Sequence, residues 1–233
     1  MQHWSTEQIR RLLEEREPAR LFEQAVSLSR SLGMPYISWT FFSNTPGTKQ
    51  QITFYNNFPE AWGLLYEKQF LATDPVAHAC RHTTSAVLWD DELFESVPDL
   101  RQQASAHGLR HGWTQAVHDL HHNESQISVA RPEHKISITE FYDKSVQIGW
   151  LGTTLHRALT EHLLAQRQPL PKLSNRELEV LRWSAAGKTA ADIAMILSLS
   201  LSTVNFHIRS IIGKTNASNK AAAIAIGVTY GLI

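Results

Sequence analysis

Two long segments of the chain repeat apolar residues at helical spacing, residues 5–32 and residues 139–164. Each segment therefore predicts an amphipathic helix that buries one face. Pro18 interrupts the first stripe, and Gly33 ends it. The chain is thus expected to begin with helical structure and to return to it after a different middle region.

The region between these helices has shorter apolar runs separated by turn signals. Residues 36–42 and 51–55 are aromatic and β-branched and predict two strands, joined by a turn at Asn-Thr-Pro-Gly 44–47. Strands bounded by helices at both ends predict an α+β fold in which a sheet packs between helices. The further elements expected from the pattern are strands around Val117 and over 127–130, a short apolar stretch at 86–89, and helices over 59–70 and 99–107.

Capping signals divide the chain from residue 173 onward into four short helices. Ser174-Asn175-Arg176-Glu177 and Thr189-Ala190-Ala191-Asp192 match the capping box, in which a hydroxyl and a carboxylate satisfy each other's backbone amides. A third helix is expected to start at Ser200–Thr203 and a fourth near Ser218. Four short helices, the third with a polar face, predict a helix-turn-helix DNA-binding domain.

The third of these helices has an apolar face around Val204 and a polar face opposite. The polar face presents Ser202, Asn205 and Arg209. In the major groove, arginine pairs with guanine and asparagine with adenine. Such a face alone is also typical of a solvated helix, but the capping boxes and the basic balance favour DNA. The side chains expected at the rim, where phosphate contacts form, are Lys188, Thr189, Thr203, Lys214 and Lys220.

Charge is distributed unevenly, although the net charge of the chain is zero. From Lys172 onward there are seven basic and three acidic residues, so the preceding part is acidic. A small basic domain beside a larger acidic one is typical of a DNA-binding protein with a separate regulatory module. Glutamines and prolines over 164–172 predict a linker, which gives domains at 1–163 and 173–233.

Several classes of protein find no support in the sequence. The single cysteine, Cys80, excludes an internal disulfide and a cysteine-based zinc site. Without a basic-apolar leader or a run of about 18 apolar residues, we expect a cytoplasmic bacterial protein outside the membrane. Gly-x-Ser-x-Gly and Gly-rich phosphate loops do not occur, so we expect no enzyme and no cofactor. His118, His121 and His122 lie near Asp119 without a second acidic or cysteine partner, so we expect no metal site. A phosphoacceptor receiver is disfavoured because the chain opens with a helix.

Three aromatic residues and one carboxylate are candidate functional residues of the amino-terminal region. Trp62, Tyr66 and Phe70 lie four apart, on one face of a helix, which plain core packing also explains. Asp74 follows amid apolar residues, where an unpaired buried carboxylate costs several kcal/mol. It is either a buried hydrogen-bond acceptor or the cap of a helix beginning at Pro75, and the sequence leaves both interpretations open.

Taken together, the carboxy-terminal motifs resemble the LuxR-type helix-turn-helix. The resemblance implies a four-helix domain that binds operator DNA as a dimer. Asn205 and Arg209 would occupy base-reading places, whereas Lys188, Thr203 and Lys214 would contact the DNA backbone. The segments that carry the resemblance are Leu173–Glu177, Ala186–Thr189, Asp192–Ala194, Ser202–Ile208, Lys214 and Asn219-Lys220.

The amino-terminal spacing resembles the acyl-homoserine-lactone-binding domain of the same quorum-sensing regulators, which implies an α-β-α sandwich around one lipid-like signal. The residues that carry this resemblance are Trp62, Tyr66, Asp74, Trp89, His107–Gly112 and Ile127–Arg131. By this resemblance, Trp62 would donate to the lactone carbonyl, Asp74 would accept from the ligand amide and Trp89 would pack on the lactone ring. Tyr66 and Ser128 would serve the acyl carbonyl.

One position departs from this family. The residue before Pro59 is usually tyrosine there, and this chain has Phe58. Losing a hydrogen bond to a buried carbonyl costs about 1–3 kcal/mol unless another donor replaces it. Either Tyr66 and Ser128 serve that carbonyl alone, or the ligand is not a standard acyl-homoserine lactone.

These resemblances predict a ligand-dependent transcriptional regulator of quorum sensing. It would sense an N-acyl-homoserine lactone and bind a near-palindromic operator as a homodimer. The alternative is a regulator of the same architecture that responds to a non-lactone signal, such as a plant-derived one, or acts without ligand.

Overall fold

Five strands form one sheet in the amino-terminal part of the chain, in the order β2-β1-β5-β4-β3. The structure is a computed structural model that describes residues 4–43, 51–119, 123–165 and 172–233. The pairs β1–β5, β4–β5 and β3–β4 are antiparallel. The strands are β1 (Tyr36–Ser43), β2 (Gln51–Asn56), β3 (Val87–Leu88), β4 (His111–His118) and β5 (Glu124–Arg131).

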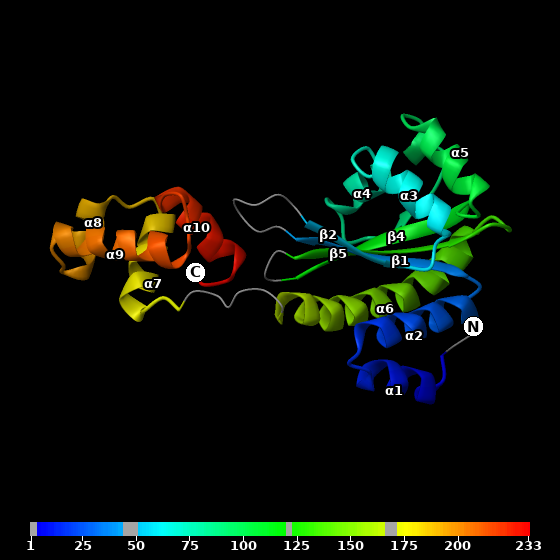
Figure 1. Cartoon of the computed structure of the whole chain (residues 1–233), viewed down its shortest axis with the longest axis horizontal. Helices are drawn as coiled ribbons and strands as arrows, with labels where there is room; N and C mark the ends of the chain where they lie inside the picture. Colours follow the sequence, from blue (N-terminus) through cyan, green and yellow to red (C-terminus); the bar gives the residue numbers. More distant parts are fainter. Residues whose placement is uncertain (1–3, 44–50, 120–122, 166–171) are drawn as a thin grey trace. The chain divides into compact units, whose positions relative to one another are not determined.

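Helices cover both faces of this sheet, which confirms the predicted α-β-α sandwich. Figure 1 shows α1, α2 and α6 on one face and α3, α4 and α5 on the other. The bounds are α1 (Thr6–Glu14), α2 (Pro18–Ser31), α3 (Glu60–Gln69), α4 (Pro75–Cys80), the 3-10 helix η1 (Glu92–Phe94), α5 (Pro98–Ala106) and α6 (Ile138–Ala165).

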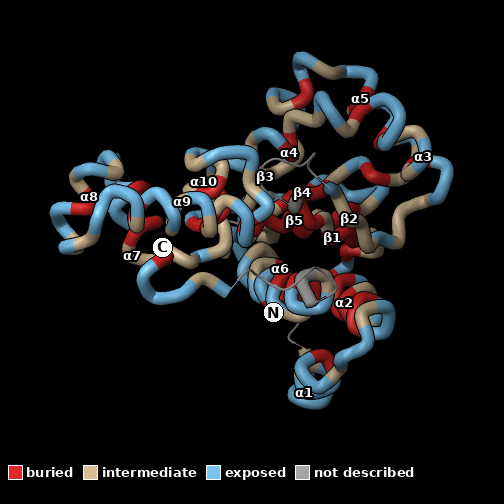
Figure 2. Tube along the Cα trace, turned by 60° about the vertical axis from the view of Figure 1, so that its left-hand side comes forward, coloured by how far each residue is buried: buried red, intermediate tan, exposed pale blue. Residues whose placement is uncertain are grey.

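Alternation along the strands gives the two faces of the sheet different chemistry. On β1, Ile37, Trp39 and Phe41 are buried in the core that also contains residues of α2 and α6. Figure 2 shows this burial along the strands and on the inner sides of both helices. The intervening Ser38 and Thr40 line a cavity on the α3–α5 side. The sheet is therefore an apolar wall on one face and a partly polar floor on the other.

Two expectations about the boundaries change in the structure, and two others cannot be compared with it. The stripe at 5–32 is two helices, because Pro18 opens α2 and the Glu17 carboxylate caps it through the Ala19 and Arg20 amides. α6 runs to Ala165, so the first two residues assigned to the linker are helical. The turn at 44–47 and most of the linker, residues 166–171, lie outside the described residues.

Four helices form the carboxy-terminal unit: α7 (Asn175–Ala185), α8 (Ala190–Leu197), α9 (Leu201–Lys214) and α10 (Lys220–Thr229). Ser174 and Thr189 form complete capping boxes, and Ser200 caps α9, as the sequence predicts. The fourth cap is Asn219, one residue after the predicted Ser218. α8 and α9 are bent by 111° across their short break, within the usual range for a helix-turn-helix.

Candidate functional site

A cavity lies between the sheet and the α3–α5 layer of the amino-terminal unit. The space open to the centres of water-sized molecules is about 100 Å³. One water needs about 10–15 Å³ by this measure, so the cavity has room for a larger guest. The six residues predicted to bind a ligand all line it: Phe58, Trp62, Tyr66, Asp74, Trp89 and Ser128.

Much of the remaining wall of the cavity is apolar, which suits the burial of a hydrocarbon group. This apolar wall includes residues of the helices α4, η1 and α5 and of the strands β1 and β2. These apolar lining residues include Phe42, Phe54, Leu71, Val76, Phe94, Leu100, Ala104 and Leu109.

Asp74 caps a helix and lines the cavity at the same time, so both interpretations left open by the sequence apply. One carboxylate oxygen accepts from the Val76 amide at 2.8 Å, which starts α4. The other accepts from the Tyr66 hydroxyl at 2.6 Å. In this structure the Tyr66 hydrogen is therefore directed to Asp74, and the phenol oxygen keeps acceptor capacity.

Burial controls the protonation of this pair. Burial raises the pKa of Asp74, and the hydrogen bonds from Tyr66, Val76 and Ala77 offset only part of that rise. Burial, followed by the charge of Asp74, raises the pKa of Tyr66 well above its ordinary value. Tyr66 consequently stays protonated near neutral pH. The Asp74 carboxylate is poorly solvated, and a further N–H donor inside the cavity would stabilise its charged form.

Trp62 is held by aromatic neighbours. Its ring centroid lies 5.6 Å from Tyr66, 6.1 Å from Phe70 and 5.7 Å from His107, and the residue is 5% exposed. Within the described part of the chain, its indole N–H forms no hydrogen bond. Trp62 therefore offers a positioned donor at the wall of the cavity.

Trp89 is fixed differently. Its indole nitrogen donates to the Thr114 hydroxyl at 3.0 Å, and the Thr114 and Ser128 hydroxyl oxygens lie 2.9 Å apart. Its ring lies over Gly112, where an added Cβ would approach two ring carbons at 2.8 and 2.9 Å. The absence of a side chain at Gly112 thus permits the position of Trp89.

Several polar residues of the cavity were not predicted from the sequence. Ser38 on β1 is directly opposite Ser128, which is opposite Thr114 on β4, so three hydroxyl side chains cross the floor. The alternation of β1 could have identified Ser38 as facing away from the apolar core. The other unpredicted polar lining residues are Thr40, Asn56, Glu67, Arg101 and Gln126.

Gln126 and Arg101 are among the polar side chains of the cavity that are already bonded to the protein. The Gln126 side-chain nitrogen donates to the Glu124 carboxylate at 2.7 Å and to the Ala77 carbonyl at 3.2 Å. Arg101 donates to the Arg110 carbonyl at 2.8 Å, and its guanidinium carbon lies 5.1 Å from the Phe94 ring centroid. These contacts hold both side chains as fixed parts of the wall.

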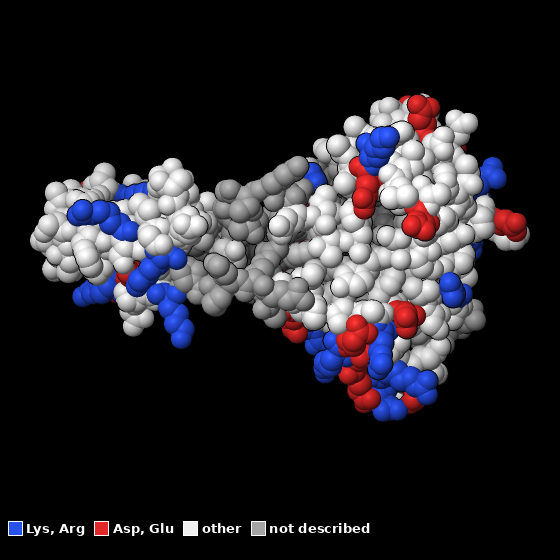
Figure 3. Space-filling view, in the orientation of Figure 1, with Lys and Arg blue, Asp and Glu red and all other residues white. Residues whose placement is uncertain are grey.

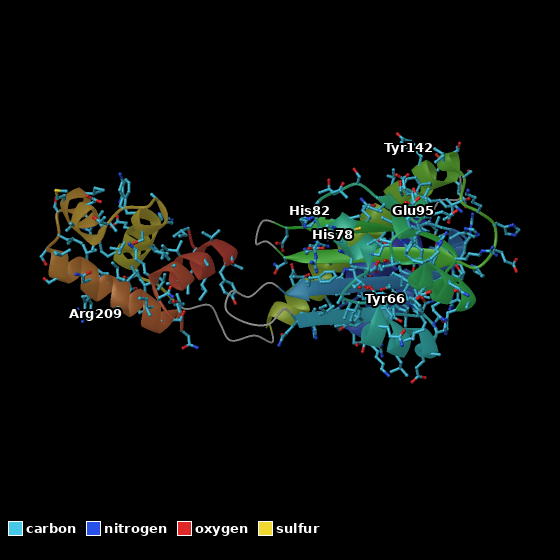
Figure 4. The ribbon with its side chains drawn as sticks, turned by 90° about the horizontal axis from the view of Figure 1, so that it is seen from above. Tyr66, His78, His82, Glu95, Tyr142 and Arg209 are labelled. Atoms are coloured by element: carbon cyan, nitrogen blue, oxygen red, sulfur yellow. The ribbon has the colours of Figure 1, made fainter. Side chains whose placement is uncertain are left out.

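α9 presents the predicted base-reading residues to solvent. Ser202, Asn205 and Arg209 are exposed, whereas Val204 and Ile211 are 0% and 2% exposed. Figure 4 shows Arg209 on the outer side of α9. The buried face of α9 therefore anchors the helix, and the opposite face is available to a partner.

The residues predicted to contact the DNA backbone form different contacts within the protein. Lys188 and Thr189 are exposed at the start of α8, and the Thr189 hydroxyl donates to Asp192 at 2.7 Å. The Thr203 hydroxyl lies 2.7 Å from that of Ser200. The Lys220 ammonium donates to the Lys188 carbonyl at 3.3 Å.

Lys214 is tied to the interior of the carboxy-terminal unit. Its ammonium pairs at 2.7 Å with Glu177, which is 4% exposed and also accepts from Ser210 at 2.7 Å and from the Ser174 amide at 2.6 Å. Burial raises the pKa of Glu177, but the Lys214, Ser210 and Ser174 hydrogen bonds lower it further, to about 2. Glu177 thus joins α7 to α9 rather than facing a partner.

The surface of the carboxy-terminal unit is mainly basic where it is charged. Figure 3 shows several Lys and Arg side chains on its visible face and little acidic surface. Phosphate oxygens would be attracted to such a surface.

Within the described ranges, no single helix is long and apolar enough to cross a membrane, although α8 and α9 together meet the length and composition of a bent pair.

Two family models match the chain. An autoinducer binding domain matches residues 17–159, and the luxR family of bacterial regulatory proteins matches residues 171–226. The Escherichia coli regulatory protein SdiA is 36% identical over 88% of this chain and 86% of its own. The quorum-sensing regulator RhlR of Pseudomonas aeruginosa is 34% identical, with the same coverage of each.

Structural comparison agrees with these matches. A structure of SdiA in complex with octanoyl-rac-glycerol is 33% identical and superposes with a TM-score of 0.80, covering 100% of this chain and 98% of that one. The relatives are transcriptional regulators rather than enzymes. The chain belongs to the LuxR family of autoinducer-binding transcriptional regulators of quorum sensing.

Proposed function

We propose that this regulator binds an N-acyl-homoserine lactone in the amino-terminal cavity and, in the cytoplasm, a near-palindromic operator as a homodimer. The signal-binding domain would end with α6 at Ala165, and a linker up to residue 172 would join it to the DNA-binding domain at 173–233. The observation that carries the proposal is the convergence of Trp62, Asp74, Trp89 and Ser128, from separate elements, on one cavity.

The chemistry of this cavity matches the head of an acyl-homoserine lactone. The Trp62 N–H would donate to the lactone carbonyl, and the Asp74 carboxylate would accept from the amide N–H. A hydrogen bond to a charged acceptor is stronger than one between neutral groups, so this contact would contribute strongly to binding. Trp89 would pack on the ring, Ser128 would serve the acyl carbonyl, and the apolar wall would hold the acyl chain.

A non-lactone signal is the second candidate, and two observations favour it. Phe58 supplies no hydroxyl, and in this structure the Tyr66 hydrogen is directed to Asp74. One donor for the acyl carbonyl is thus missing. In addition, the similar SdiA structure is a complex with octanoyl-rac-glycerol, which has an acyl chain but no lactone.

Ligand-dependent stability distinguishes these candidates. The full-length protein would be expressed without additive, with lactones of increasing acyl length, and with octanoyl-rac-glycerol. A ligand that binds the folded form should raise the melting temperature by about 5–10 °C at a hundredfold excess over Kd. A rise with octanoyl-rac-glycerol alone would favour the non-lactone signal, and no rise with any lactone would overturn the proposal.

Asp74→Asn tests the acceptor while preserving the shape of the residue. We expect lactone affinity to fall by about tenfold or more, because the amide would lose a charged acceptor. Asp90→Asn is the matched control, since Asp90 caps the Leu93 amide and does not line the cavity. Unchanged affinity in Asp74→Asn would remove the proposed role of this carboxylate.

The homodimer is supported by an apolar stripe along α6. Ile138, Tyr142 and Val146 are exposed by 73%, 74% and 70%, and Trp150 follows at 38%. Residues four apart share one helix face, so these side chains form one continuous strip. A second copy of the chain would cover it and bring a second α9 to a symmetric half-site.

Arg209→Ala tests the DNA part of the proposal. Removal of a bidentate guanine contact should cost about 1–3 kcal/mol and relax base preference at one position in each half-site. Binding-site selection from random DNA, performed with wild type and variant, measures that preference. An unchanged selected sequence would contradict the base-reading role of Arg209.

A further inference from the structure

The recognition helix carries an aromatic side chain on its exposed face. Phe206 is 63% exposed and follows Asn205 directly. Its ring centroid lies 5.7 Å from that of its neighbour His207. Phe206 is not a member of the buried apolar cluster of the carboxy-terminal unit. Single exposed apolar residues are common on protein surfaces, so the position of Phe206 decides its meaning.

The position of Phe206 is set by helix geometry. With 3.6 residues per turn, Phe206 lies within about 60° of both Ser202 and Arg209 around α9. It lies nearly opposite Val204 and Ile211, which anchor the helix in its domain. Phe206 therefore belongs to the same face as the polar residues that would enter the major groove.

Among the bases, thymine presents a methyl group in this groove, and phenylalanine is one of the side chains that contact it. We propose that Phe206 reads a thymine methyl group in each operator half-site. The inference rests on the proposed DNA-binding role of α9 and adds an apolar contact to the polar contacts of Asn205 and Arg209.

The helix dimensions limit where the thymine can lie. Phe206 and Arg209 are separated by about 4.5 Å along the helix axis. Base pairs of one strand are spaced by about 3.4 Å. We therefore expect the thymine read by Phe206 within a few base pairs of the base that Arg209 contacts.

The test measures how tightly the full-length protein binds DNA duplexes that differ by a single methyl group. An operator is selected from random DNA, and each thymine is then replaced by uracil, which removes the methyl group alone. We expect one such replacement per half-site to weaken wild-type binding by about three- to tenfold, as the loss of a buried methyl predicts. Replacements elsewhere should have smaller effects.

Two variants connect this effect to the side chain. Phe206→Ser should bind the thymine and uracil duplexes equally, whereas Phe206→Leu should keep part of the preference. Met195→Ser is the matched control, because Met195 is an apolar side chain that is 74% exposed on α8 rather than on α9. It should keep the full thymine preference. Unchanged melting temperatures would show that all three variants fold.

The outcomes separate this inference from the proposed function. If wild type selects no DNA sequence, the operator-binding proposal fails and Phe206 has no base to read. If wild type binds its operator but Phe206→Ser retains the same thymine preference, the reading role of Phe206 alone is overturned.

Discussion

At the scale of single residues, Phe58 is the position most directly linked to ligand choice. Its ring lies 6.4 Å from Tyr36, edge to face, on the cavity wall. Phe58→Tyr would add a phenol donor there. We expect lactone affinity to rise by about five- to tenfold if the new hydroxyl reaches a buried carbonyl, and isothermal titration would measure it. Equal or weaker binding would indicate that the natural ligand needs no donor at this position.

A functional residue could be predicted from the sequence where its own side chain determines the chemistry. The rarity of a carboxylate amid apolar residues drew attention to Asp74, and the structure gives it two simultaneous partners. Arg101 could not be found in the same way. Its contribution to the cavity depends on where α5 packs, which no local pattern encodes.

At the scale of elements, Gly112 on β4 tests how Trp89 is positioned. An added Cβ would collide with the Val129 carbonyl oxygen and with the Trp89 ring. Because a strand carbonyl cannot move aside freely, Gly112→Ala should destabilise the protein by about 1–3 kcal/mol or more and weaken ligand binding.

Thermal unfolding measures the effect of Gly112→Ala. Gly63→Ala is the control, because its added Cβ meets nothing within 4 Å and alanine favours a helix. It should leave stability unchanged or raise it by up to about 1 kcal/mol. A Gly112→Ala protein as stable as wild type would contradict the packing argument.

Glu177 links α7 to α9, and its loss should loosen both helices. Its pKa of about 2 lies below the ordinary value of 4.5. The stabilisation is therefore complete above pH 4.5 and is lost as pH falls toward 2. Glu177→Gln at neutral pH should cost on the order of 1–3 kcal/mol, because the buried pair loses its charge.

Hydrogen exchange of α7 and α9 in the full-length protein measures this loss locally. Glu179→Gln is the matched control, since its pair with Arg176 is solvent-exposed on both sides. Faster exchange in both variants, or in neither, would contradict a special role for Glu177.

Elements with local start signals were predictable from the sequence. Ser174, Thr189 and Ser200 mark helices that begin where expected. The cavity floor was not predictable, because Ser38 and Thr114 become neighbours of Ser128 only through strand pairing across long stretches of sequence. Register of this kind is a property of the folded sheet rather than of any segment.

At the scale of the whole molecule, the α6 stripe predicts how copies associate. Val146→Glu would place a charge in the centre of the apolar strip and should convert the proposed homodimer to monomer, with weaker operator binding. Light scattering after size exclusion measures the mass. Leu64→Glu is the control, because Leu64 is 68% exposed on α3, which covers the other face of the sheet. A dimeric Val146→Glu protein would place the interface elsewhere.

The series from Trp89 through Thr114 to Ser128 is fixed at one end only. An indole nitrogen gives a hydrogen and cannot receive one. Thr114, which is 1% exposed, receives it, and its oxygen can still either give a hydrogen to Ser128 or receive one from it. With Thr114 as the donor, the hydrogen of Ser128 is free for a ligand oxygen. With Ser128 as the donor, its oxygen is free for a ligand N–H group. This hydroxyl pair can therefore match either polarity by rotating two hydrogens, without moving a heavy atom.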